Sequence, residues 1–119
     1  MNMTPDQILD AAADALESMG HTKKELLAES GEMCALGAIN YATHGRALPT
    51  ATEVAGESFY TTTQLRAMSA LVNELPAPKI PYYSALKDVD ITRWNDDEKT
   101  TPTEVIDTLR FAAKRFRNG

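Results

Sequence analysis

The sequence predicts an all-α protein, a compact single-domain bundle of about four main helices that spans residues 1–119. Two segments, 4–20 and 101–117, repeat apolar residues at helical spacing and begin with a threonine and a proline, a typical helix start. Residues 31–45 are mostly small or apolar, as expected of a central helix buried on nearly all sides. At 119 residues, the chain has the length of one domain with one hydrophobic core.

The first helix is expected between Thr4 and Gly20. Thr4 and Gln7 have the spacing of a capping box, and Pro5 stands in the first turn, where its missing N–H costs nothing. The apolar stripe comprises Ile8, Leu9, Ala12, Ala15, Leu16 and Met19. Residues 21–30, which follow, are compatible with either a short helical turn or an irregular connection.

The segment from Gly31 to Gly45 is predicted to be the central and most buried helix. Ser30 is placed to cap it, and Gly45 permits the left-handed conformation that ends many helices. A glycine in the middle of a helix costs about 1 kcal/mol relative to alanine, so Gly37 suggests that another helix backbone approaches closely there. The one polar exception, Asn40, needs hydrogen-bond partners if it is buried.

Residues 46–60 are rich in small and polar side chains, and we expect a loop there. A third helix should begin at Thr61 or Thr62 and run to about Glu74, because Pro76 stops it. Its apolar face comprises Leu65, Met68, Leu71, Val72 and Leu75.

A Pro-rich strap is predicted over residues 75–83. Pro76, Pro78 and Pro81 favour an extended backbone and remove hydrogen-bond donors, which is unfavourable for a strand inside a sheet. Tyr82 and Tyr83 are the expected anchors of this strap, and they are candidate partner-binding residues.

Residues 90–96 indicate one turn of helix capped by Asp90, which places Ile91 and Trp94 on the same side. The last helix should begin after Thr101 and follow the helical period closely. Its apolar stripe comprises Val105, Ile106, Leu109, Ala112, Ala113 and Phe116, and its outer face should carry Arg110, Lys114, Arg115 and Arg117.

The charge is distributed unevenly along the chain. The net charge is −5, which argues against general nucleic-acid binding, because that binding depends on neutralising phosphates. Residues 1–60 hold nine acidic and three basic side chains, net −6, whereas residues 61–119 hold eight acidic and nine basic, net +1. The two halves are therefore expected to attract each other, and the acidic half could meet a basic partner.

The expected location is the cytoplasm. No apolar run approaches the length of a membrane span, and the N-terminus lacks the pattern of a secretory signal. A single cysteine excludes an internal disulfide. We therefore expect no membrane association.

Two short motifs resemble those of a known family. The sequences CALGA at Cys34–Ala38 and WND at Trp94–Asp96, ahead of a threonine-capped last helix, resemble a family of small uncharacterised proteins from actinobacteria and their phages. The resemblance covers most of the chain. It implies an actinobacterial or actinophage origin, and it supplies no catalytic residues because no activity is established for that family.

Cys34 is a weak catalytic candidate. At the start of a helix the dipole can lower a thiol pKa and produce a nucleophile, which also needs a base. His44 lies ten residues further on, about 15 Å along the helix axis, so only His21 could approach Cys34 through the fold. A lone cysteine among alanines is more typical of a buried core residue, and that interpretation is favoured.

Two other places are candidates for binding. Asn95 and Asp96 beside Trp94 could hold a small ligand, although capping of backbone groups, with the tryptophan in the core, is the favoured interpretation. Phe111 falls outside the apolar stripe of the last helix, so either the Pro-rich strap covers it or it contacts another protein.

Three function classes remain, in decreasing order of preference. The first is a small phage or actinobacterial accessory protein that acts as an interaction module on a host protein. The second is a protein that binds a small ligand or sequesters a nucleotide, and the third is a cysteine enzyme. No catalytic motif is complete, so a protein without enzymatic activity is favoured.

No cofactor or metal site is expected, since one cysteine and two histidines lack the paired spacing of metal ligands. Formation of a homo-oligomer is left as an alternative.

Overall fold

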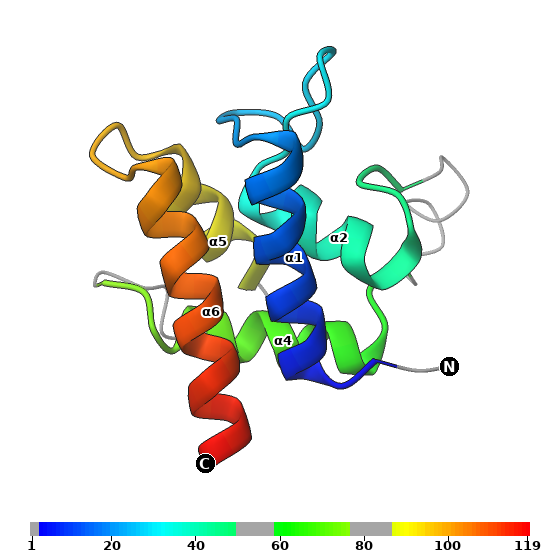
Figure 1. Cartoon of the computed structure of the whole chain (residues 1–119), viewed down its shortest axis with the longest axis vertical. Helices are drawn as coiled ribbons and strands as arrows, with labels where there is room; N and C mark the ends of the chain where they lie inside the picture. The colour runs from blue at the N-terminus through cyan, green and yellow to red at the C-terminus, as the bar shows by residue number, and fades with distance from the viewer. Residues whose placement is uncertain (1–2, 50–58, 77–86) are drawn as a thin grey trace.

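The first and last helices run antiparallel and side by side, as α1 (Pro5–Met19) and α6 (Pro102–Asn118) in Figure 1. The computed structural model describes residues 3–49, 59–76 and 87–119. In these ranges the remaining helices are α2 (Ala35–His44), α4 (Thr62–Val72) and α5 (Lys87–Asp96), and no β-strand forms beyond two isolated bridges. The all-α prediction is confirmed, with five helices described where about four main ones were expected.

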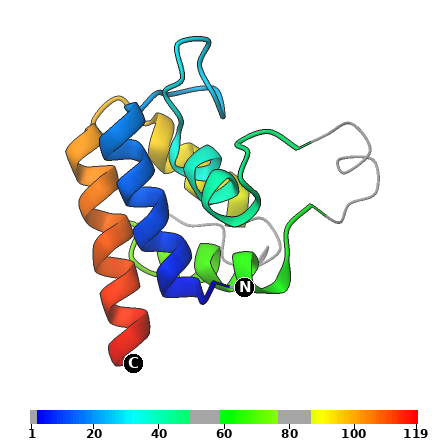
Figure 2. The same ribbon diagram turned by 45° about the vertical axis from the view of Figure 1, so that its right-hand side comes forward.

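The other helices pack around α1. α1 contacts α6, α2 and α4, while α4 also packs against α5 and α6 and crosses the lower part of the bundle in both views (Figures 1 and 2). The radius of gyration is 13.1 Å, close to the ~13 Å of a compact domain of about 100 residues. The hydrophobic core draws residues from all five helices.

Threonine caps start three of the helices, as the sequence predicted. The Thr4 backbone N–H donates to Gln7 Oε1 at 2.9 Å, which is one half of the capping box. The hydroxyls of Thr61 and Thr101 each accept a hydrogen bond from the backbone N–H three residues later, at 3.0 and 3.1 Å. These bonds satisfy backbone donors that have no partner within the helix.

The central helix is shorter than predicted. α2 begins at Ala35 and not near Gly31, and Cys34, not Ser30, is its N-cap. The prediction failed because Met33 exchanges two backbone hydrogen bonds with the segment just after α1, at 2.9 and 3.1 Å. This pairing holds the residues before Cys34 extended, so residues 21–33 form an irregular connection, the second of the two expected alternatives.

The burial of the central helix agrees with the prediction. All six residues from Ala35 to Asn40 are buried, a continuous run that no other described helix has, and Gly45 ends the helix at φ +82°. The close approach at Gly37 is also present, although its partner is different. A Cβ atom on Gly37 would lie 2.0 Å from the carbonyl oxygen of Leu26, which belongs to the irregular connection and not to a helix.

The helix around Trp94 is longer than predicted. α5 has ten residues and starts at Lys87, so Asp90 lies inside the helix and is not its cap. Carboxylates at positions 88 and 90 favour a helix start further upstream, because negative charge is stabilised near the N-terminal end. Ile91 and Trp94 are both buried, as their spacing predicted.

Several predictions concern residues outside the described ranges. These include most of the loop 46–60 and most of the Pro-rich strap with Tyr82 and Tyr83. Leu75, at the start of the strap, is buried. None of the described helices combines the length and the apolar character needed to cross a bilayer.

Candidate functional site

Cys34 is a buried thiol at the N-cap of α2. Its side chain is 3% exposed, and its Sγ accepts a hydrogen bond from the backbone N–H of Gly37 at 3.3 Å. Burial raises the pKa of the Cys34 thiol, and the nearby backbone N–H groups offset that rise only in part. The described residues include no hydrogen bond between Cys34 and either histidine. Within the described part of the chain, the thiol therefore has neither the exposure nor a bonded histidine base that an activated nucleophile requires.

Asn95 joins three segments of the fold. Its Oδ1 lies 2.7 Å from Nε2 of His21 and accepts the backbone N–H of Ala35 at 2.9 Å. Its Nδ2 donates to the carbonyl oxygen of Thr22 at 3.2 Å and to Asp96 Oδ1 at 3.0 Å. The amide is fully buried, so these bonds link α5, the start of α2 and the segment after α1. Both ends of the amide are occupied by protein groups.

The neighbours of Asn95 complete this link. Asp96 Oδ1 also accepts the backbone N–H of Lys24 at 2.8 Å, and Lys23 Nζ donates to the carbonyl oxygen of Asp97. Trp94 is 7% exposed and belongs to the core. The three residues of the WND motif thus sit in contacts within the protein, and binding of a ligand there stays a prediction.

Phe111 is the most exposed large hydrophobic residue among those described, at 52%. It borders a shallow depression whose other lining residues are Glu74, Thr101, Thr103, Glu104, Asp107 and Thr108. The Arg115 guanidinium lies 5.8 Å from the centre of the Phe111 ring and also pairs with Glu74 at 2.8 Å. The surroundings of Phe111 are polar, and its contact with a partner stays a prediction.

A more apolar concave surface lies elsewhere among the described residues, in a groove of about 480 Å³ at the C-terminal end of α1. Its lining residues are Met19, Leu27, Gly31, Met33, Tyr41, Arg46, Ala47 and Leu48. We call this surface the α1–α2 groove. Met19, Leu27, Tyr41 and Leu48 are 41%, 38%, 36% and 48% exposed, which is unusual for large apolar residues that lie together.

The first wall of the groove, residues 20–33, is held by backbone hydrogen bonds. Gly31 N–H donates to Ala28 O at 2.9 Å, and Ala28 N–H donates to Glu32 O at 2.7 Å. Leu26 packs its carbonyl against Gly37, which positions the next side chain, Leu27, at the groove.

The second wall, residues 46–48, is fixed by a chain of buried amides. Asn40 Nδ2 donates to the carbonyl oxygen of Ala47 at 2.9 Å, and Asn40 Oδ1 accepts from Gln64 Nε2 at 2.6 Å. The Gln64 Oε1 atom in turn lies 2.8 Å from Nε2 of His44, whose ring stacks on Phe59 at 4.2 Å. Asn40 therefore has the partners that its burial requires, and both walls are formed in the free protein.

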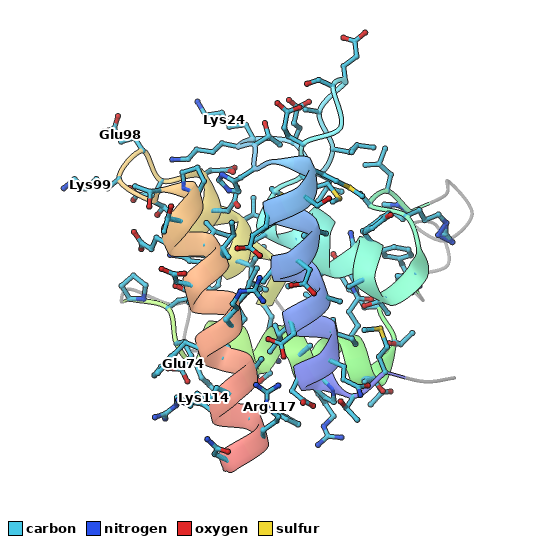
Figure 3. The ribbon with its side chains drawn as sticks, viewed as in Figure 1. Lys24, Glu74, Glu98, Lys99, Lys114 and Arg117 are labelled. Carbon is cyan, nitrogen blue, oxygen red and sulfur yellow. The ribbon has the colours of Figure 1, made fainter. Side chains whose placement is uncertain are left out.

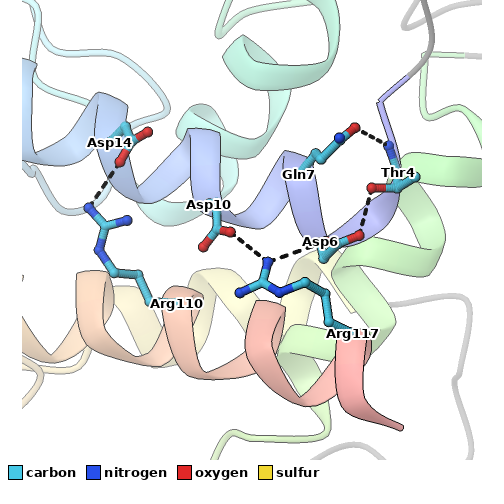
Figure 4. A network of polar contacts seen from close by, with 7 residues as sticks. All are labelled: Thr4, Asp6, Gln7, Asp10, Asp14, Arg110 and Arg117. Atoms are coloured by element: carbon cyan, nitrogen blue, oxygen red, sulfur yellow. Dashed lines mark hydrogen bonds and ion pairs between the residues drawn. The ribbon is translucent and has the colours of Figure 1, made fainter.

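The charges around the groove differ from those along α6. Arg110 pairs with Asp14 at 3.0 Å, and Arg117 pairs with Asp10 at 2.8 Å (Figure 4). Arg110 also pairs with Glu17. Arg110 and Arg117 were predicted on an outer face of α6, and instead they reach across to α1. The carboxylates of α1 are therefore largely neutralised by the last helix.

Three carboxylates on the first groove wall lack such partners. The described part of the chain contains no ion pair to Glu25, Glu29 or Glu32. The Ser30 hydroxyl donates to Glu32 and lowers the pKa of that carboxyl. Lys24 points away, since it lies beside the α5–α6 turn with Glu98 and Lys99, across the molecule from residues 46–49 (Figures 1 and 3).

Sequence reasoning missed this groove for identifiable reasons. Met19 was assigned to a buried stripe, although it ends its helix, where the neighbouring turn no longer covers it. Leu27 and Leu48 lie in segments without periodicity, so the direction of their side chains could not be inferred. A usable signal was the pair Leu26–Leu27, because adjacent side chains of an extended segment point to opposite sides, so that one of the two leucines would face outward.

Metal-ligating side chains form no cluster in the described ranges. No three His, Cys, Asp or Glu side chains among these residues gather closely enough to hold a metal ion.

Tyr60 is a half-buried phenol close to Asp88. Burial, followed by the charge of Asp88, raises the pKa of Tyr60 to about 12. Tyr60 therefore stays protonated at neutral pH and cannot act as a general base.

Comparison with known proteins identifies a family for the chain. A family model described as a family of unknown function, DUF6197, matches residues 1–115 of the chain. No curated protein and no solved structure shows significant similarity. Because the match covers nearly the whole chain, the protein belongs to this family.

Proposed function

We propose that this member of the DUF6197 family is a protein-interaction module that binds its partner through the α1–α2 groove. The observation that supports this most directly is the clustering of exposed apolar side chains. Four of the seven large hydrophobic residues exposed in the described ranges share this groove, namely Met19, Leu27, Tyr41 and Leu48. The other three, Leu65, Val89 and Phe111, lie on three different helices.

Clustering matters because exposed apolar residues scattered singly are normal on a protein surface, whereas grouped ones mark contact sites. Removing apolar surface from water contributes about 25 cal/mol per Å², and interface energy is concentrated in a few buried anchors. A groove with two preformed walls also loses little conformational entropy when a partner binds.

The origin and setting are part of the proposal. The motifs at residues 34–38 and 94–96 support an actinobacterial or actinophage source, and a host protein as the target. A single cysteine and a net charge of −5 are in keeping with the cytoplasm, or with the host cytoplasm for a phage protein.

A second candidate function is the capture of a small apolar ligand in the same groove. Its volume of about 480 Å³ falls within the ~300–1,000 Å³ typical of ligand sites. We rank it second because four of the lining side chains are more than a third exposed. Ligand pockets of this kind usually enclose most of the ligand.

The test compares two leucine substitutions with equal starting exposure. Leu27 in the groove and Leu65 on α4 are both 38% exposed, so Leu27→Asp and Leu65→Asp make the same chemical change on and off the groove. Each tagged protein is used to capture partners from actinobacterial lysate. A captured protein is then purified, and its Kd is measured for the wild type, Leu27→Asp and Leu65→Asp.

The proposal expects Leu27→Asp to weaken binding by at least about tenfold, as loss of an interface anchor does, and Leu65→Asp to bind like the wild type. Equal weakening by both variants, or by neither, would overturn the assignment of the groove. The ligand alternative is tested directly on protein purified from lysate. Small molecules are extracted from that protein and identified by mass spectrometry.

A further inference from the structure

The α1–α2 groove differs from the rest of the surface in the charge that surrounds it. The carboxylates of α1 are paired with Arg110 and Arg117 on α6. On the first groove wall, Glu25, Glu29 and Glu32 have no ion pair within the described residues. Apolar side chains and unneutralised negative charge thus occur on the same segment, which supplies Leu27 and Met33 to the groove.

Two basic residues of the first wall are directed elsewhere. The Lys23 ammonium group donates to the carbonyl oxygen of Asp97, and Lys24 lies beside the α5–α6 turn (Figure 3). On the second wall, the Arg46 guanidinium lies 5.6 Å from the centre of the Phe59 ring. The first wall therefore carries three carboxylates without an ion pair among the described residues, and Arg46 is the basic residue that lines the groove on the second wall.

The groove also restricts the backbone form of its occupant. Extended peptides usually bind by adding main-chain hydrogen bonds to a free strand edge. The N–H of Gly31 and both backbone groups of Met33 are already bonded within the protein, and the described residues offer no strand. A helix satisfies its own backbone and needs only apolar side chains on one face.

From these features we infer that the groove binds a basic amphipathic helix of a partner protein. Its apolar residues at helical spacing would enter the groove between Leu27, Tyr41 and Leu48, and lysine or arginine residues beside the apolar stripe would face Glu25, Glu29 and Glu32. This inference rests on the proposed function and adds the chemistry of the partner.

The probes are three synthetic peptides of about 18 residues, which form about five helical turns. The first has a leucine stripe flanked by lysines, and the second replaces the lysines with glutamates. The third keeps the composition of the first but scrambles the order, which removes the stripe. Each is added to the full-length protein.

The chain contains its own reporters for this experiment. Two of its five methionines, Met19 and Met33, line the groove, whereas Met68 is buried in the core at 1% exposure. With ¹³C-labelled methionine methyl groups, NMR titration gives the Kd and the site together. Binding in the groove should shift the Met19 and Met33 signals and leave the Met68 signal unchanged.

The inference expects the lysine peptide to bind at least about tenfold more tightly than the glutamate peptide and the scrambled peptide, and to weaken as salt rises. Changing Glu25, Glu29 and Glu32 together to Gln should remove most of the preference for lysine. The matched control changes three exposed carboxyls elsewhere, Glu98→Gln, Glu104→Gln and Asp107→Asn, and should retain it.

Failure of this inference can be distinguished from failure of the proposed function. Equal binding of the lysine and glutamate peptides, lost in Leu27→Asp, overturns the basic partner and leaves the docking groove standing. The basic partner is likewise overturned, and the docking groove is left standing, if no peptide shifts the Met19 or Met33 signal while binding of a captured protein still depends on Leu27. Lysine-peptide binding that Leu27→Asp leaves unchanged overturns both.

Discussion

The α1 helix has two kinds of surroundings, and the contrast between them locates the candidate site. Along its length α1 packs against α6, and its carboxylates pair with Arg110 and Arg117 (Figure 4). At its C-terminal end Met19 stays exposed and joins Leu27, Tyr41 and Leu48 in a groove with an acidic wall. The contact between α1 and α6 buries apolar side chains and pairs charged ones. The groove leaves apolar side chains exposed, and the carboxylates on its first wall have no ion pair among the described residues.

This difference separates what holds the fold together from what is available for binding. The charged residues that are most conspicuous in the sequence, on the first and last helices, are used within the protein. The groove that we propose for a partner is lined mostly by segments that show no periodic pattern, residues 20–33 and 46–48, together with Met19 of α1 and Tyr41 of α2. Binding residues commonly lie on loops, because loops run over the surface and are held in place by a rigid scaffold.

The largest effect is expected from filling the space at Gly37, which supports the first groove wall. In an exposed helix, Gly→Ala would stabilise by about 1 kcal/mol. Here the added Cβ would meet the Leu26 carbonyl oxygen at 2.0 Å, so Gly37→Ala should instead destabilise by about 3 kcal/mol or more. Gly37→Leu should be worse still. Urea unfolding measures both, and an unchanged or raised stability would contradict the close approach.

The second largest effect is expected at Asn95, which ties the same wall to α5. Asn95→Ala removes the acceptor of the Ala35 N–H and leaves buried groups unsatisfied, at a cost of about 3 kcal/mol. Asn118→Ala, at the exposed end of α6, should be close to neutral. A loss below about 1 kcal/mol for Asn95→Ala, by thermal or urea unfolding, would show that the link is not needed.

A smaller effect is expected at Cys34, whose thiol is packed beneath the groove wall. Cys34→Ala should leave a small cavity and cost roughly 1 kcal/mol, with binding of a partner intact. Because burial raises the thiol pKa, a thiol reagent should label the native protein slowly at neutral pH and the unfolded protein quickly. Rapid labelling of the folded protein at pH 6 would instead indicate an activated nucleophile.

The smallest effect is expected from the ion pairs between α1 and α6. Arg117→Met should cost less than about 1 kcal/mol, since both partners are partly exposed, and the melting temperature should change little with salt. The Thr4 hydroxyl, followed by Arg117, lowers the pKa of Asp6 from 3.8. The contribution of Asp6 is therefore present above pH 3.8 and lost as the pH falls below it. A large salt-dependent drop in melting temperature would reveal a stronger network.

Sequence reasoning recovered the elements with a clear apolar period and missed those without one. The helices α1 and α6 were predicted closely, because threonine caps and regular stripes define them. The start of α2 was misplaced, since pairing of Met33 with the segment after α1 is a contact between distant residues that no local pattern reveals. The same limitation hid the groove, because Leu27 and Leu48 face it only through the fold.

The sequence also drew attention to Phe111, which competes with the groove as a contact site. Phe111 is 52% exposed but lies alone among threonines and carboxylates, whereas Leu48 is 48% exposed and lies with three other exposed apolar residues. The two side chains are thus similarly exposed, but Phe111 has polar neighbours and Leu48 has apolar ones.

The most direct measurement places a photo-crosslinking amino acid at position 48 in one form of the protein and at position 111 in another. Each form is irradiated with the partner isolated by capture, and the covalent product is quantified and mapped by mass spectrometry. The account predicts a strong crosslink from position 48 and little from position 111. A crosslink from position 111 with none from position 48 would contradict the assignment of the groove as the docking surface.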